Sequence, residues 1–206
     1  MNVTCFSVGG LGTNCYIVSD DSGHAAIIDP GGDAKRIINA VKDSNLTVDF
    51  ILLTHAHFDH IMAVEELCDA TGAQILVGAA DAPMLYDAQL NLSAMVYPTQ
   101  AVEVTAHRLL FDGEIIRVGD AMLTVMETPG HTRGSVCYLG DGVLFSGDTL
   151  FAGSIGRTDL PGGDMTVLRR SLARLATLDG DYTVHPGHGE ETTLSFEKAA
   201  NPYLAF

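Results

Sequence analysis

The stretch THAHFDH, residues 54–60, follows directly on the apolar run VDFILL. Such a run is typical of a buried strand, and a strand ends at a sheet edge, where loops can form a site. His55 and His57 are two residues apart, so both side chains point to the same side of extended chain. Asp59 lies nearby, and His60 begins the helical pattern that follows. Four polar donors at the end of a buried strand have no packing role, so the stretch predicts metal binding.

Three further motifs follow apolar runs and lie beside glycine: ETPGHTRGS with His131, LFSGDTLF with Asp148 and TVHPGHGEE with His188. Glycine lets the backbone approach an ion closely and adopt positive φ. The four motifs offer seven donors, more than one four-coordinate ion needs, whereas two ions about 3.5–4 Å apart would use them all. Imidazole and carboxylate donors suit zinc, iron or manganese. The sequence therefore predicts two divalent cations, with zinc favoured.

The other histidines carry no comparable pattern. His24 lies in a hairpin sequence, His107 in the middle of the chain, and His185 shortly before the GHG motif. A lone histidine is more often a hydrogen-bonded structural residue than a ligand. We therefore predict structural roles for all three.

Short β-branched runs separated by turn residues predict nine strands. Their expected ranges are Cys15–Val18, Ala25–Ile28, Phe50–Leu53, Gln74–Val77, Glu114–Val118, Met122–Glu127, Ser135–Leu139, Val143–Phe145 and Tyr182–Val184. The turns in RVGDAML and YLGDGVLF indicate antiparallel hairpins. Because hairpins alternate with helical patterns, we expect sheet layers covered on their outer faces by helices.

Helical patterns lie at residues 34–44, 61–70 and 165–178, and a further short helix is expected within 191–206. We expect Asp33 to cap the first and Asp164 to cap the third. The second is expected to end near Gly72. The third carries an arginine cluster, which we interpret as a solvated helix face.

Composition limits the choice of partners. The 206 residues fit one domain, 1–206, and the formal charge of −15 argues against binding to nucleic acid or to an anionic membrane surface. The N-terminus lacks the layout of a secretory signal, and no window approaches the roughly 18 apolar residues of a membrane helix. The four scattered cysteines are typical of reduced thiols. A cytoplasmic protein is therefore expected.

The motifs resemble, in their order along the chain, those of the metallo-β-lactamase superfamily. This resemblance implies an α/β fold, an αββα four-layer sandwich, with the site on the rim between two sheets. It also implies that His55, His57 and His131 bind a first metal. The second metal would be bound by Asp59, His60 and His188, with Asp148 bridging both ions.

Within that superfamily, the stretch TLFAGSIGRTDLPGGD resembles the glyoxalase II branch, the hydroxyacylglutathione hydrolases. There a basic residue meets a glutathione carboxylate, and Arg157 stands in its place; Arg133 is a second expected substrate contact. Two features differ from that branch. Its full-length members add a helical C-terminal domain, for which this chain has no counterpart, and they carry an aromatic residue where Asp159 stands. The chain is thus similar to the short, single-domain members.

The predicted reaction is hydrolysis of a small-molecule thioester such as S-lactoylglutathione. Two cations would lower the pKa of a shared water from 15.7 towards about 7, and the resulting bridging hydroxide would attack the thioester carbonyl. Asp148 would bridge the ions, and Asp59 would orient the nucleophile. The leaving thiol, with a pKa of about 8.5, needs no strong general acid.

Three alternatives stay open. A mononuclear iron persulfide dioxygenase shares HxHxDH and the GRTD segment. A lactonase or β-lactamase would use the same metals on an ester or amide, although neither is expected to carry GRTDLPGG. A non-catalytic metal-binding module would have to retain all seven donors without using the water that they activate.

Overall fold

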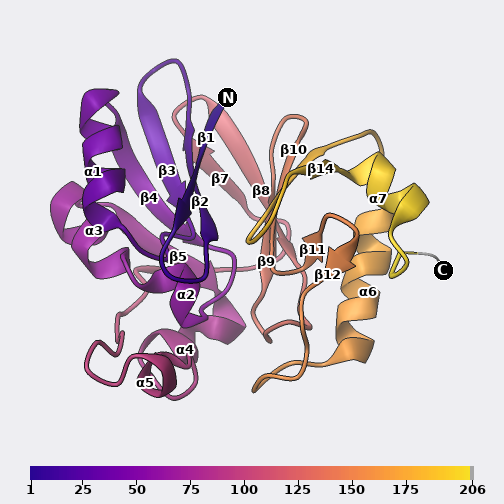
Figure 1. Cartoon of the computed structure of the whole chain (residues 1–206). Helices are drawn as coiled ribbons and strands as arrows, with labels where there is room; N and C mark the ends of the chain where they lie inside the picture. Colours follow the sequence, from indigo (N-terminus) through magenta and orange to yellow (C-terminus); the bar gives the residue numbers. More distant parts are fainter. Residues whose placement is uncertain (205–206) are drawn as a thin grey trace.

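The computed structural model describes residues 1–204 and contains two large mixed sheets that face each other (Figure 1). The first sheet has the order β1-β2-β3-β4-β5-β6. Its strands are β1 (Asn2–Val8), β2 (Thr13–Ser19), β3 (His24–Ile28), β4 (Thr47–Leu53), β5 (Gln74–Gly78) and β6 (Arg108–Leu110). The pairs from β3 to β6 are parallel and those from β1 to β3 antiparallel.

The second sheet has the order β14-β13-β10-β9-β8-β7. Its strands are β7 (Ile115–Val118), β8 (Ala121–Glu127), β9 (Val136–Leu139), β10 (Val143–Gly147), β13 (Thr183–Pro186) and β14 (Thr192–Thr193). A small hairpin of β11 (Leu150–Phe151) and β12 (Ser154–Ile155) follows β10. The β7-β8 and β9-β10 pairs are the antiparallel hairpins that the GD turns predict.

Helices cover the outer face of each sheet. Helices α1 (Ala34–Asp43) and α3 (Val64–Thr71) lie against the first sheet, while α6 (Met165–Ala176) and α7 (Leu194–Ala200) lie against the second (Figure 1). Short helical turns α2 (Phe58–Ile61), η1 (Ala79–Asp81), α4 (Ala82–Leu85) and α5 (Ser93–Val96) lie in the connections of the first half. The layers are therefore α, β, β and α, which confirms the expected sandwich.

Three apolar clusters correspond to the three interfaces between these layers. Ile51 and Leu53 of β4 pack toward the α1 and α3 side, whereas Leu52, between them, faces the second sheet. The alternation follows from the period of two in a strand, and both faces of β4 are buried because it is a central strand. Leu168 and Leu172 of α6 belong to the cluster behind the second sheet. Because both faces of β4 are covered, the C-terminal end of this strand is buried between the helical layer and the second sheet.

The predicted helices differ from the observed ones in detail. Asp164 caps α6 by accepting the N–H groups of Thr166 and Val167, as expected. Asp33 occupies the expected N-cap position of α1, but its carboxylate accepts the N–H of Gly9 and makes no capping hydrogen bond to the helix. The expected helix 61–70 is observed as α2 and α3, with Gly72 in left-handed conformation at the end of α3.

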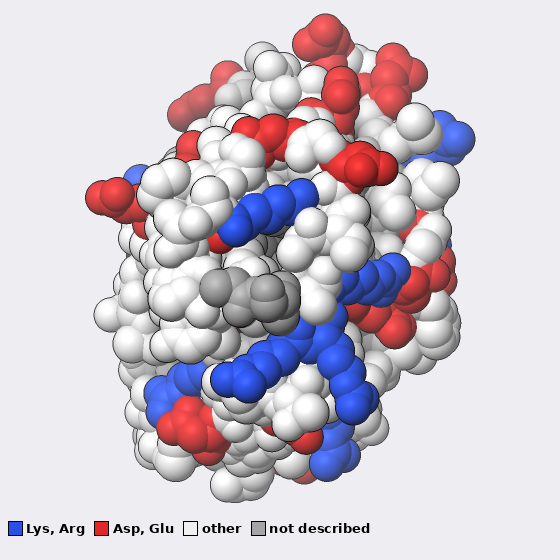
Figure 2. All heavy atoms as spheres, turned by 90° about the vertical axis from the view of Figure 1, so that its right-hand side faces the viewer, with Lys and Arg blue, Asp and Glu red and all other residues white. Residues whose placement is uncertain are grey.

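The arginine cluster of α6 lies on the exposed side of that helix. Arg174 pairs with Asp112 at 2.7 Å, and Arg169 and Arg170 are exposed. On the side of the molecule that bears this helix, basic side chains lie toward the middle and bottom and acidic ones mainly toward the top (Figure 2).

No helix within residues 1–204 combines the length and apolar character that a membrane crossing needs.

Candidate metal centre

Loops from both sheets meet at one edge of the sandwich and bring the predicted donors together. His55 and His57 follow β4, and His131 follows β8. Asp148 directly follows β10, and His188 lies just beyond β13. Because these strands are buried, their ends are fixed, and the donors meet although up to 133 residues separate them.

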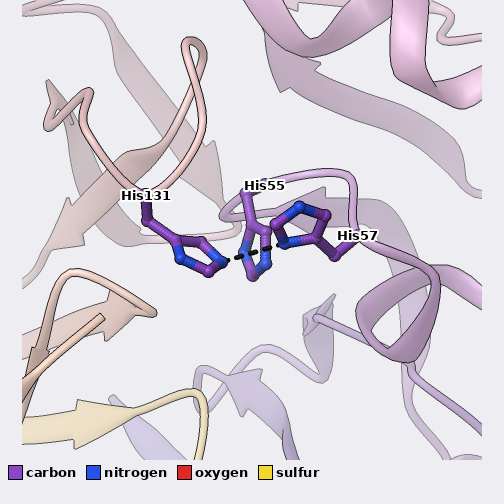
Figure 3. Close-up of side chains that lie close together, drawn as sticks. All are labelled: His55, His57 and His131. Carbon is purple, nitrogen blue, oxygen red and sulfur yellow. Dashed lines mark hydrogen bonds between the residues drawn. The ribbon is translucent and has the colours of Figure 1, made fainter. Parts of the chain in front are cut away.

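The first group consists of His55, His57 and His131, whose rings converge from two opposing loops (Figure 3). All three are buried, and one ligand atom from each lies within 4.8 Å of the others. Nδ1 of His57 lies 2.9 Å from Nε2 of His131. Nδ1–H of His131 donates to the carbonyl oxygen of Arg157 at 2.7 Å, which leaves its Nε2 free to bind an ion.

The second group consists of Asp59, His60 and His188. Oδ2 of Asp59 lies 3.1 Å from Nε2 of His188 and 3.5 Å from Nε2 of His60. Asp148 lies between the groups, with Oδ1 3.5 Å from Nε2 of His60 and Oδ2 3.5 Å from Nε2 of His131. Its two oxygens therefore face donors of different groups, as a bridging carboxylate requires.

Several buried atoms of this cluster lack hydrogen-bond partners among the residues that the structure describes. They are Nε2 of His55, His57 and His60 and Oδ1 of Asp148. Buried polar atoms without partners are costly and therefore rare in native proteins. Cations bound between them would satisfy imidazole nitrogen and carboxylate oxygen alike, so the donor set fits divalent metal ions.

The pKa shifts in the cluster favour neutral imidazoles at His55 and His57 of the first group and an ionised carboxylate at Asp59 of the second. Burial, with neighbouring imidazoles, lowers the pKa of His55 and brings that of His57 to about 3. Burial raises the pKa of Asp59, but His60 and His188 outweigh it and hold that pKa well below its usual range. A deprotonated imidazole and an ionised carboxylate are the forms that bind metal.

The pKa of His60 is controlled by the neighbouring carboxylates. Burial lowers its pKa, but Asp59, Asp148 and Asp29 outweigh this effect and raise the pKa to about 10. The position therefore favours positive charge, which either a proton or a metal cation supplies.

Asp29 is a site residue that sequence reasoning missed. Its Oδ2 accepts from Nδ1–H of His60 at 3.0 Å and from Oγ1–H of Thr54 at 2.5 Å, and its Oδ1 accepts the N–H of Thr54 at 2.7 Å. Asp29, His55 and His60 also form a group with donor atoms in reach of one ion. Asp29 faces Nδ1 of His60, whereas Asp59 and Asp148 face Nε2, so we interpret it as orienting the ring. The available signal was a carboxylate directly after a buried strand.

Asp81 is the second missed residue and connects the two loops that carry the first group. Its carboxylate accepts the N–H of Gly134 at 2.7 Å, Oγ1–H of Thr132 at 2.7 Å and the N–H of Ala56 at 3.2 Å. Ala56 lies between two histidines of one loop, and Thr132 follows His131 on the other. Burial raises the pKa of Asp81, while these hydrogen bonds lower it. The residue comes from η1, for which the sequence carried no signal.

Gly187 permits the close approach that the GHG motif predicts. A Cβ at this position would collide with Oδ1 of Asp148 and come within 2.8 Å of Cε1 of His60. A side chain here would displace both donors, so the residue before His188 has to be glycine.

Two of the remaining histidines make the hydrogen bonds expected of structural residues, whereas Nδ1 of His185 is buried without a hydrogen-bond partner among the described residues. Nδ1 of His24 lies 2.8 Å from Oδ2 of Asp49, and Nδ1 of His107 accepts the N–H of Ile75 at 3.1 Å. The ring of His185 stacks on Phe145 with centroids 5.0 Å apart. All three lie outside the groups of converging donors.

A cavity of about 570 Å³ opens beside the cluster. His57, Asp59, His131, Asp148 and His188 line it together with Arg157 and several apolar side chains. Arg133, the other expected substrate contact, is not among its lining residues. It lines two neighbouring hollows with Gly162 instead.

A two-sheet sandwich with this histidine and aspartate cluster at its rim defines a metal-binding hydrolase fold. The family model for the metallo-beta-lactamase superfamily matches residues 8–188, and the chain belongs to this superfamily. Among curated proteins, it is 40% identical to a probable metallo-hydrolase, YqgX, of Bacillus subtilis, covering 96% of this chain and 94% of the relative. It is 34% identical to hydroxyacylglutathione hydrolase GloC of Haemophilus influenzae, covering 99% and 98%.

Solved structures show the same architecture. A B3 metallo-beta-lactamase, BLEG-1, is 39% identical with a TM-score of 0.94 and 100% coverage of both chains. The protein TTHA1623, solved in a di-iron-bound form, is 36% identical with a TM-score of 0.87, covering 98% of this chain and 100% of that one. ETHE1 from Myxococcus xanthus is 30% identical with a TM-score of 0.82, covering 100% and 85%.

Proposed function

We propose that this protein is a metal-dependent thioester hydrolase, of which S-lactoylglutathione is a representative substrate. The observation that carries the proposal is the set of seven donors from separate loops, arranged as two groups with Asp148 between them. The similarity to hydroxyacylglutathione hydrolase GloC supports thioesters as the substrate class.

In this proposal each residue has a defined task. His55, His57 and His131 would hold one divalent cation, Asp59, His60 and His188 a second, and Asp148 would contact both. Zinc is the favoured metal, and the di-iron form of TTHA1623 makes iron a second choice. When bound, the cations supply Lewis acidity and lower the pKa of water that they contact.

The protein itself positions the substrate beside that cluster. Apolar side chains of the cavity would exclude water from the acyl group, and Asp59 would orient a nucleophile through Oδ1 while its Oδ2 faces His188. A thiol leaving group departs without a strong general acid, so the cluster needs no further catalytic side chain.

Replacement of Asp148 by Ala tests this function directly. We expect turnover of S-lactoylglutathione and of a neutral thioester to fall more than about 100-fold, with loss of bound metal, because both groups lose a shared ligand. Turnover and metal content are measured together. Asp112→Ala, which removes one exposed carboxylate that is not part of the cluster, serves as the control. Unchanged turnover at full metal content in the Asp148 variant would contradict the proposal.

The same preparation separates the alternatives. Similarity to a structure described as a B3 metallo-beta-lactamase favours one of them, hydrolysis of β-lactams, so a β-lactam is included beside the thioesters. Oxygen consumption with glutathione persulfide and one iron per chain would instead identify a dioxygenase. Thioester turnover that exceeds both activities supports the proposed function.

A further inference from the structure

Arg157 lines the cavity beside the metal cluster, and its guanidinium is paired with Asp159. Nε lies 2.7 Å from Oδ1 of Asp159, and Nη2 lies 2.7 Å from Oδ2. This two-point arrangement is the one in which a guanidinium binds a carboxylate most strongly. The carboxylate of Asp159 therefore occupies the Nε/Nη2 edge of the guanidinium, one of its two bidentate edges, and balances its charge.

The rest of the cavity offers no substitute for that guanidinium. Among the described residues that line it, Arg157 is the only Lys or Arg, while the lining carboxylates belong to the metal cluster. The wall is largely apolar, formed by Leu11, Leu92, Met95, Val96, Ile155 and Leu160. An apolar substituent would gain contact with this wall, whereas a carboxylate would meet a guanidinium whose charge Asp159 already balances.

We propose that Asp159 is a specificity-determining residue, which neutralises Arg157 and directs the cavity toward thioesters with apolar, uncharged substituents. The inference rests on the proposed function, because it concerns the substrate of the same site. The side chains of Arg157 and Asp159 are 61% and 68% exposed. An ion pair this exposed is weak, so Asp159 disfavours carboxylate-bearing ligands without excluding them.

Asp159 remains charged over the range in which the protein would be assayed. The hydrogen bonds from Arg157 lower its pKa to about 2. The charge with which Asp159 balances Arg157 is therefore constant around neutral pH.

Binding of two non-hydrolysable thioethers tests the inference. S-Hexylglutathione carries two carboxylates, and its diethyl ester carries none. Calorimetry with the metal-loaded full chain gives the ratio of their affinities. In Asp159→Asn we expect this ratio to shift about three- to five-fold toward the carboxylate form, the range that corresponds to loss of one exposed charge pair.

Two further variants control the result. Asp112→Asn breaks the similar exposed pair with Arg174 and changes the net charge equally, so its ratio should equal that of the wild type. In the double variant Arg157→Gln, Asp159→Asn the affinity ratio should no longer shift toward the carboxylate form, because no guanidinium is left to bind it. An unchanged ratio in Asp159→Asn, an equal shift in Asp112→Asn, or no binding of either ligand by any variant would overturn the inference. Thioester turnover by the wild type tests the proposed function separately from the ratio of affinities.

Discussion

At the scale of single residues, the arrangement of the candidate metal ligands depends on side chains outside the set of seven donors. Asp29 illustrates this, because its two oxygens accept from His60 and from Thr54, next to His55. It has a φ of 50°, a strained value for a residue other than glycine. Such strain is retained where the surrounding contacts require it.

Asp29→Asn is expected to weaken metal binding about 10- to 100-fold, the usual effect of removing a partner that orients a ligand. Asparagine keeps the volume but loses one acceptor and the negative charge that favours a cation at His60. Competition with a chromophoric chelator measures the affinity. Asp43→Asn, an exposed change of equal charge on α1, is the control, and equal affinity of a folded Asp29 variant would refute the expectation.

At the scale of elements, every strand expected from sequence is observed within a few residues of its predicted bounds, because alternating burial leaves a local pattern. The missed elements have weaker patterns. Strand β1 is an edge strand with mostly exposed or half-buried residues, and β6, β11, β12 and β14 have only two or three residues each. Met165, in the first turn of α6, is 38% exposed, whereas Leu168 and Leu172 further along the helix are buried.

Asp81→Asn tests whether η1 holds the two histidine loops together. Asparagine offers one acceptor oxygen where the carboxylate of Asp81 receives three donors on two oxygens. At least one buried donor is then unpaired, and we expect the free energy of unfolding to fall by about 1–3 kcal/mol. Urea unfolding of the metal-free chain measures this. Asp69→Asn, exposed on α3, should have little effect, and a loss of similar size there would discount the interpretation.

At the scale of the whole molecule, polar contacts between the two sheets supplement the apolar core. Asp20, after β2 of the first sheet, accepts the N–H of Asp120 at 2.6 Å, in the β7-β8 turn of the second sheet. It also accepts from Ser22 and from the N–H of His24. These contacts, the hydrogen bond with Asp120 foremost, lower the pKa of Asp20 to about 2 from its ordinary value of 3.8.

The lowered pKa of Asp20 predicts a pH-dependent contribution to stability. The folded state binds fewer protons than the unfolded one between these two values, so the contribution is fully present above about pH 4 and disappears as pH falls through about 2. The difference in melting temperature between wild type and Asp20→Asn should follow this course. Asp21→Asn, an exposed neighbour, provides the comparison. A difference that persists unchanged below pH 2 would contradict the assignment.

By itself the sequence determined the elements and the chemistry of the donors. Buried strands leave a period of two along the chain, and histidines or carboxylates placed directly after them have no packing role, so both signals are local. The αββα layering was then expected from the resemblance that these motifs carry.

The tertiary structure alone decided which distant carboxylates support those donors. The contact of Asp29 with His60 joins residues 31 positions apart, and Asp81 meets Thr132 across 51 positions. Asp33 lies at the N-cap of α1 without a side-chain capping bond, because its carboxylate accepts the N–H of Gly9, 24 positions earlier. Hydrogen bonds of this kind depend on how segments far apart in the chain fold together, and no short window of sequence encodes that arrangement.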